Sequence, residues 1–139
     1  MSTIFTKIIE GEIPGTFVYR DDVCVSFMSI NPIADGHLLV VPREEIDEWT
    51  DLSTATAQHV LNISHTLGRV VKDSHNCVRA GLIIAGYEIN HCHLHVIPTN
   101  TMDDLDFRNA APSVTREYLE AQAQMIRQSM KKYGIEPSL

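Results

Sequence analysis

The sequence NHCHLHVIP, which spans Asn90 to Pro98, places histidines at every second position, as His91, His93 and His95. The histidines alternate with the less polar residues Cys92, Leu94 and Val96. Because successive side chains of a β-strand point to opposite faces, a strand here puts three imidazoles on one face and the less polar set on the core face. Packing alone does not explain three imidazoles in one row. The row therefore predicts a functional site.

Two chemistries compete for this row of histidines. On a strand that rises about 3.3 Å per residue, the Cα atoms of His91 and His95 are separated by roughly 13 Å. Zinc–nitrogen bonds are only about 2.0–2.1 Å long, so three rings on one ion are strained, although two of them could bind a metal. A phosphate ligand suits the row better, since one neutral ring nitrogen can attack phosphorus while neighbouring rings stabilise its oxygens. We therefore expect no metal and no cofactor.

Apolar periodicity predicts the elements around this stretch. Apolar residues such as Val60 and Leu67 recur at spacings of three and four between Ser53 and Asn76, which is typical of a long amphipathic helix. Composition further predicts a surface loop over 103–112, a second helix after Ser113, and strands over 17–20, 23–30, 37–41, 79–84 and 91–98. Strands, helix, strands and helix in this order indicate the α+β class with an antiparallel sheet.

Length and composition narrow the classes of protein and partner. The chain has 139 residues, which predicts a single domain over residues 1–139. Its net charge of -7 predicts a surface that repels a phosphate backbone, so we expect no nucleic-acid partner, although a small phosphate ligand can bind in a pocket. The 3 cysteines show no C-x-x-C spacing and no apolar run reaches the roughly 20 residues of a membrane span. We expect a cytoplasmic protein without a membrane partner.

The segment His91–Ile97 resembles the signature of the histidine-triad (HIT) family, His-x-His-x-His followed by apolar positions. Ile4–Pro14 and Gly36–Pro42 are similar to the N-terminal segment and central strand of that family, and Arg79–Gly86 to a stretch of poorly characterised bacterial HIT-like proteins related to its Hint branch. The resemblance implies a HIT-type fold, with a five-stranded antiparallel sheet, a long helix and a C-terminal helix. It also implies a homodimer, which we expect to use the apolar stripe of the helix after Ser53.

The resemblance assigns a role to each histidine of the row. His93 is expected to attack the α-phosphorus and form a nucleotidyl-histidine that water then hydrolyses. His95 is expected to bind phosphate oxygens. His91 and His37, the latter matching a fourth histidine of the family, are expected to orient and polarise the nucleophile as a relay. The alternative for His37 is a core histidine at the start of a strand.

The same resemblance implies a binding slot for the nucleotide. The apolar positions that match the base slot of the family are Ile4, Phe5, Ile8, Phe27 and Ile30. Periodicity cannot distinguish this slot from ordinary core. Gly86 matches a backbone position close to the phosphate, and its alternative is a turn glycine.

Three positions depart from the family pattern. Ser29 stands where family members commonly carry an aspartate that holds the ribose, and the Asn of the Hint branch has no counterpart in residues 83–86. Glu88 replaces a Ser near the leaving group. Its carboxylate repels a phosphate when ionised, yet when protonated it can give the leaving group its proton. A solvated surface role is the third reading of Glu88.

These observations favour a metal-independent hydrolase of the HIT type. Its expected substrate is a purine nucleoside 5'-phosphate conjugate, such as a phosphoramidate, cleaved at the α-phosphorus. One alternative is a nucleotide-binding or signalling module with little turnover, which Ser29 and Glu88 favour. Another is a metal-dependent enzyme that uses a histidine pair.

Overall fold

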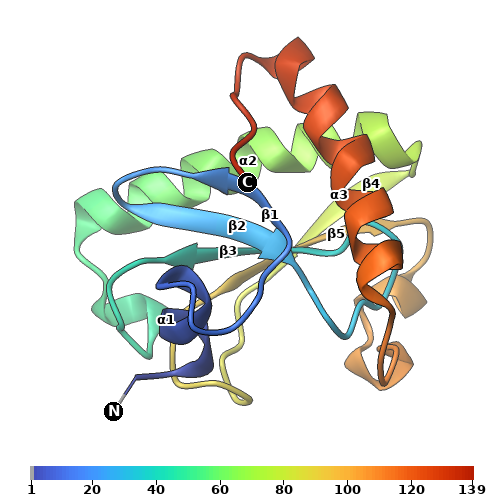
Figure 1. Ribbon diagram of the computed structural model, residues 1–139. Coiled ribbons are helices and arrows are strands. Elements are labelled where there is room, and N and C mark those ends of the chain that lie inside the picture. The colour runs from blue at the N-terminus through green and yellow to red at the C-terminus, as the bar shows by residue number, and fades with distance from the viewer. Residues whose placement is uncertain (1) are drawn as a thin grey trace.

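The computed structural model describes residues 2–139 and contains one mixed arrangement of helices and strands (Figure 1). Its helices are α1 (Ile4–Ile9), α2 (Thr54–His75) and α3 (Arg116–Met130). Its strands are β1 (Phe17–Arg20), β2 (Cys24–Met28), β3 (Leu38–Pro42), β4 (Arg79–Ile83) and β5 (Leu94–Thr99). Single 3-10 turns occur at Trp49–Asp51, Met102–Leu105, Phe107–Asn109 and Lys131–Tyr133. The predicted α+β class is confirmed.

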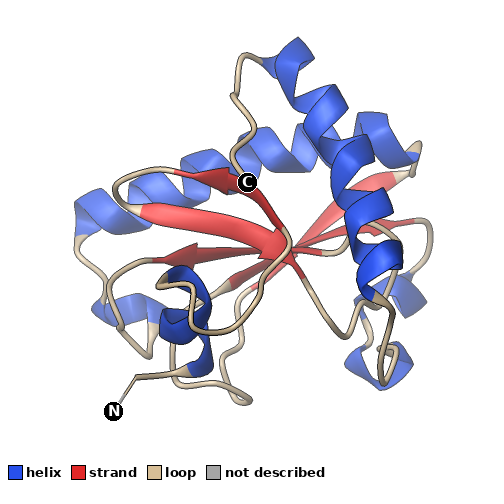
Figure 2. Cartoon of the chain, viewed as in Figure 1, coloured by secondary structure: helices blue, strands red, loops and turns tan. Residues whose placement is uncertain are grey.

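The strands form one sheet in the order β1-β2-β3-β5-β4, and every neighbouring pair is antiparallel. Helices cover its two faces unequally (Figure 2). One face packs against α2 and α3 through strand residues such as Cys24, Leu38 and Leu94. The other face packs against the six-residue helix α1 through alternate residues such as Phe27 and Leu39. Period-two alternation thus gives each strand one residue set for each face.

The long helix α2 lies within one residue of its predicted bounds at each end. Ser53 caps its N-terminus by accepting a hydrogen bond from the backbone N–H of Thr56, and Asn76 ends it in the left-handed conformation. Its apolar stripe is buried against the sheet and α3 of the same chain; the stripe consists of Val60, Leu67, Val70 and Val71, with Ile63 packed beside them. The expectation that this stripe forms a dimer interface is therefore wrong, because the sheet and α3 of the same chain already cover it.

Two predicted segments differ from the structure. The strand predicted over 91–98 begins only at Leu94, because the N–H of Cys92 is bonded to the carbonyl of Ile46 in a distant loop instead of to a strand. The predicted surface loop over 103–112 contains two ordered 3-10 turns, capped by the side chains of Thr101 and Asp106. Clustered acidic residues thus act here as helix caps.

Residues 2–139 contain no helix with both the length and the apolar character that crossing a membrane requires.

Candidate active site

A pocket opens beside α1, on the face of the sheet that this short helix covers. Three histidines line it, His37, His93 and His95. The other predicted site residues that line it are Ile4, Phe5, Ile8, Phe27, Ser29, Ile30 and Glu88. His91 and Gly86 lie outside this lining. The fold thus brings together residues from α1, β2, β3, β5 and the segment before β5.

The ring of His93 is held in one orientation by a backbone carbonyl. Its Nδ1 lies 2.7 Å from the carbonyl oxygen of His91, and because a carbonyl only accepts, Nδ1 carries the hydrogen. In the neutral ring, Nε2 then keeps its lone pair. The ring is buried and meets Phe5 edge to face at a centroid distance of 4.9 Å. His93 therefore has a defined tautomer, in which the lone pair of Nε2 is not used by the bond to His91.

A chain of hydrogen bonds sets the tautomer of His95. The backbone N–H of Ile33 donates to Nδ1 of His37 over 3.1 Å, so His37 carries its hydrogen on Nε2. That nitrogen lies 2.9 Å from Nδ1 of His95 and donates to it. His95 in turn carries its hydrogen on Nε2, the ring nitrogen this chain leaves free. His95 can therefore offer a neutral N–H donor to a phosphate oxygen.

Burial keeps these two histidines uncharged. Desolvation, followed by the charges of neighbouring histidines, lowers the pKa of His37 from 6.5 to about 3 and the pKa of His95 to about 4. Both rings are therefore neutral at pH 7, and a protonated His95 would confront the N–H of His37 with a second hydrogen. The donor facing a ligand is thus a dipole and not a cation.

The ring of His91 performs a different task. Its Nε2 donates to the carbonyl of Pro42 over 2.8 Å, and its Nδ1 accepts from the hydroxyl of Thr3 over 2.7 Å. Thr3 is also the N-cap of α1, so His91 fastens α1 to β3. The prediction that His91 and His37 orient and polarise His93 as a relay is wrong for His37, whereas His91 orients the ring of His93 through its backbone carbonyl. The ring of His37 is bonded to His95, and only the backbone of His91 is bonded to His93.

The apolar residues of the pocket divide into buried and exposed members. Phe5, Ile8 and Phe27 belong to the core beneath α1, and the rings of Phe5 and Phe27 meet edge to face. Ile4 and Ile30 remain 40% and 53% exposed, so they present apolar surface to the pocket. Phe5, Ile8 and Phe27 thus fit both interpretations, ordinary core and base slot. Ile4 and Ile30 are not core residues.

The three remaining predicted positions show less specialised surroundings. Ser29 is buried, and its Oγ accepts a hydrogen bond from the N–H of Asn31 over 3.2 Å. Glu88 is exposed at the pocket. Gly86 has a φ of 92°, which a side chain rarely adopts, and a turn alone accounts for it. Proximity of Gly86 to a phosphate stays a prediction.

Sequence reasoning missed one wall of the pocket. Phe107 and Ala110 line it from the segment after β5, and the Phe107 ring meets that of His95 edge to face at 4.9 Å. Pro14, Gly15 and Thr16 also line it. The one available signal was a lone aromatic residue in a polar segment, Phe107 between Asp106 and Arg108. Helix or strand periodicity could not have placed it beside His95.

Comparison with known proteins points to the same family as the His-x-His-x-His motif and the geometry of the pocket. The HIT domain family matches residues 10–102. The uncharacterized HIT-like protein MJ0866 of Methanocaldococcus jannaschii is 40% identical over 99 residues, 68% of this chain and 77% of that protein. The adenosine 5'-monophosphoramidase hnt1 of Schizosaccharomyces pombe is 29% identical over 99 residues, 70% of this chain and 74% of that one.

A solved structure extends the similarity to nearly the whole chain. The crystal structure of a Hit-like protein involved in cell-cycle regulation from Bartonella henselae superposes with a TM-score of 0.80 at 30% identity. The match covers 92% of this chain and 96% of that protein. Matching residues, matching fold and a histidine-lined pocket lead to one conclusion: the chain belongs to the HIT family.

Proposed function

We propose that the protein hydrolyses nucleoside 5'-phosphate conjugates, such as phosphoramidates, at the α-phosphorus without a metal. The observation that carries this proposal is the pair of tautomers in the pocket, a bare Nε2 on His93 beside an Nε2–H on His95. One is a nucleophile and the other a donor for the phosphate oxygens. The monophosphoramidase named among the similar proteins supports the same substrate class.

The proposed reaction has two steps. Nε2 of His93 attacks the α-phosphorus, the bond to the leaving amine breaks, and the amine takes up a proton from solvent or from protonated Glu88 at the pocket; the water that attacks in the second step returns this proton. The phosphorylated ring of His93 is then cationic, and its Nδ1–H bond to the His91 carbonyl stabilises that charge. Water next attacks the phosphorus, releases the nucleoside monophosphate and restores the neutral ring. His95 donates to a phosphoryl oxygen throughout.

The remaining pocket residues fit the rest of a nucleotide. We assign the purine base to the apolar surface of Ile4, Phe5, Ile8, Phe27 and Ile30, since a planar ring covers the exposed parts of Ile4 and Ile30. Ser29 would hold the ribose. Its Oγ already accepts from Asn31, so its O–H is free to donate to one ribose hydroxyl. One such bond predicts weaker ribose discrimination than a carboxylate gives.

We also propose a homodimer that does not use the buried stripe of α2. Strand β4 is at the edge of the sheet, where its outer hydrogen-bonding side has no strand neighbour among residues 2–139. Val78, Leu82 and Leu61 expose apolar surface beside it. An exposed edge with apolar neighbours favours pairing with another chain. Light scattering at micromolar concentration tests this, and a mass near the 15.6 kDa of one chain would contradict it.

A second candidate function is a nucleotide-binding module with little turnover. The exposed carboxylate of Glu88 at the pocket favours it, because an ionised carboxylate repels a substrate phosphate. In this case the pocket binds nucleotide, and His93 is never modified.

A panel of substrates in the presence of a chelator tests both candidates. It contains adenosine and guanosine phosphoramidates, dinucleoside polyphosphates and adenylated amino acids. Acid quenching within one turnover followed by mass spectrometry should find a nucleotidyl group on the peptide that contains His93. Tight nucleotide binding without this adduct or product would favour the binding module. Turnover that needs a metal would contradict the proposed mechanism.

A further inference from the structure

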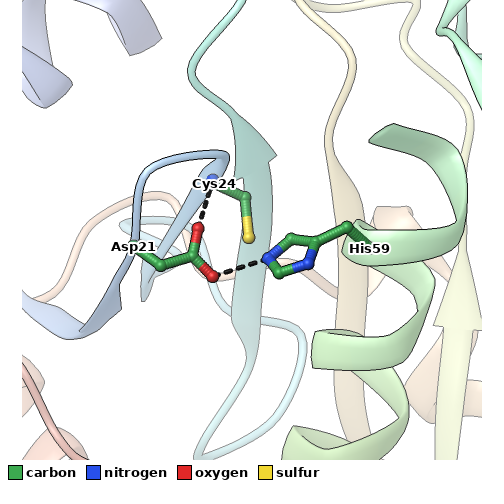
Figure 3. A group of neighbouring side chains, drawn as sticks. All are labelled: Asp21, Cys24 and His59. Atoms are coloured by element: carbon green, nitrogen blue, oxygen red, sulfur yellow. Dashed lines mark hydrogen bonds and ion pairs between the residues drawn. The ribbon is translucent and has the colours of Figure 1, made fainter. Parts of the chain in front are cut away.

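A second cluster of reactive side chains lies away from the pocket. Asp21 is in the turn between β1 and β2, Cys24 begins β2, and His59 is on α2 (Figure 3). One carboxylate oxygen, one sulfur and one imidazole nitrogen all lie within 4.8 Å of one another. None of the three residues lines the pocket, and Cys24 points to the opposite face of the sheet. The cluster is thus independent of the triad histidines.

We propose that Asp21, Cys24 and His59 bind a transition-metal ion of the zinc type, which links the β1–β2 turn to α2. Imidazole, thiolate and carboxylate together are a ligand set of zinc, and a thiolate argues against magnesium or calcium. This inference departs from the expectation of a metal-free protein. It concerns a position that the proposed hydrolysis does not use.

The distances suit a single ion. Bonds of about 2.0–2.3 Å to one tetrahedral ion place ligand atoms about 3.5 Å apart. The three ligand atoms lie within 4.8 Å of one another, so no pair must close by more than about 1 Å, and one pair is closer than the metal requires, since Nε2 of His59 donates to Oδ2 of Asp21 over 2.6 Å. Binding therefore replaces this hydrogen bond by two metal bonds and needs a local opening of about 1 Å. The proton on Nε2 of His59 shifts to Nδ1 of the same ring. The thiol of Cys24, whose pKa burial raises to about 12, releases its proton to solvent as the sulfur binds the ion.

The carboxylate of Asp21 is oriented before any ion arrives. Its Oδ1 accepts from the backbone N–H groups of Val23 and Cys24, each over 2.8 Å. Its Oδ2 faces His59 and also accepts from the hydroxyl of Tyr19 over 2.7 Å. Such outer hydrogen bonds hold a metal ligand in place.

The cluster is open to solvent on one side. The side chains of His59 and Asp21 are 35% and 22% exposed, whereas Cys24 is fully buried beneath them. An ion can therefore enter between the imidazole and the carboxylate and reach the sulfur. Three protein ligands leave the fourth tetrahedral position to water.

Cobalt(II) tests the site because a thiolate ligand gives Co²⁺ a strong near-ultraviolet charge-transfer absorption. We expect the reduced parent protein to develop this band with one Co²⁺ per chain, and Zn²⁺ to displace it. Cys24→Ser should lose the band. Cys77→Ser and Cys92→Ser are matched controls and should keep the band. Cys92 lies between His91 and His93, so this control also tests whether the ion binds at the triad instead. A parent without the band, or a band that depends on Cys92, would overturn the proposal.

Two variants that leave the core intact complete the test. His59→Gln lies on the partly exposed surface of α2 and should weaken Zn²⁺ binding at least about a hundredfold, more than the 10–100-fold typical of losing an outer-shell partner. Tyr19→Phe removes such a partner and should weaken binding about tenfold. Zn²⁺ should also raise the melting temperature of the parent but not of His59→Gln. Unchanged zinc affinity in His59→Gln would refute the site even if Cys24→Ser failed to fold.

Discussion

The two faces of the sheet are built from the same strands yet differ in how completely they are covered. On one face the 22-residue α2 and the 15-residue α3 bury Leu94 and Val96. The other face carries His95, which lies between Leu94 and Val96 in the sequence and points the opposite way. This face is covered by α1, a helix of six residues. A short helix cannot close that face, so the pocket remains beside it. The pocket lies where the cover is incomplete, whereas most of the buried core residues lie under the longer helices.

His93→Ala should show the largest effect, and it should fall mainly on activity. The substitution removes the proposed nucleophile, whose buried ring also packs against Phe5. We expect the rate to fall about 10⁴-fold or more with nucleotide affinity little changed, and the melting temperature to fall less than in Leu67→Ala. Steady-state kinetics, equilibrium binding and thermal melting measure the three quantities. Parent-level activity in His93→Ala would remove the covalent mechanism.

Leu67→Ala should show the reverse pattern. Leu67 is fully buried where α2 packs on the sheet, far in sequence from the pocket residues. Its truncation should lower the free energy of unfolding by about 2–5 kcal/mol, as typical of Leu to Ala in a core. Chemical denaturation gives this value. The nucleotide Kd of the folded fraction should match that of the parent, and a Kd changed in parallel with stability would contradict the division between the faces.

Glu88→Gln separates general acid catalysis from repulsion at the rim of the pocket. If Glu88 protonates the leaving group, the variant should cleave alkylamine conjugates about a hundredfold more slowly but keep its rate on good leaving groups such as nitrophenol. If Glu88 only repels phosphate, nucleotide binding should tighten and the leaving-group dependence should stay as in the parent. Equal slowing on good and poor leaving groups would exclude the acid role.

Acid should destabilise the protein through the pocket face. In the unfolded chain His37 and His95 bind protons near pH 6.5, but in the fold their pKa values are about 3 and 4. Between those values the unfolded state binds more protons, so stability is complete above about pH 6.5 and declines as the pH falls toward 4. The slope is roughly 1.4 kcal/mol per pH unit for each group.

Denaturant titrations between pH 7 and 4.5 measure this slope. His37→Asn should reduce it, and His65→Gln, which changes an exposed histidine, should leave it as in the parent. A pH-independent stability across this range would show that the buried rings take up protons in the folded state.

Ile4→Ala should produce the smallest change. The side chain lies at the pocket and is 40% exposed, so its truncation costs little stability. It also removes apolar surface from the proposed base slot, which should weaken nucleotide binding by about 1 kcal/mol, or roughly fivefold. Calorimetric titration with a purine nucleoside monophosphate measures this loss. Leu61→Ala, exposed outside the pocket, is the control and should bind as the parent does.

The sequence predicted elements well where a pattern repeats over many residues. The stripe of α2 recurs from Val60 to Val71, about three helical turns, and the predicted bounds of the helix were accurate to one residue at each end. The alternation at His91, His93 and His95 covers too few residues to separate a strand from an extended segment. The deciding contact is the bond from Cys92 to Ile46, 46 positions away, which no local pattern contains.

The sequence predicted most of the residues that line the candidate site, but not the hydrogen bonds between them. The resemblance to the HIT family grouped His37 with His91, His93 and His95, and the pocket is lined by His37, His93 and His95 but not by His91. Which ring bonds to which depends on the register between β3 and β5, in which Leu38 lies opposite Val96, and His37 is hydrogen-bonded to His95. Phe107 reaches the pocket through two 3-10 turns whose caps are polar side chains, so apolar periodicity could not reveal it.

The hydrogen-bond chain that begins at the backbone N–H of Ile33 has a consequence for how the site tolerates mutation. A peptide N–H can only donate, so the direction of every proton along the chain is set by a group that no side chain supplies. Nineteen of the twenty amino acids carry this N–H, so any of them at position 33 keeps the same hydrogen positions on the rings of His37 and His95. Proline alone lacks the N–H and would free both rings to reverse. The position of the hydrogen on Nε2 of His95 is thus fixed by the backbone at position 33 and not by the side chain of Ile33.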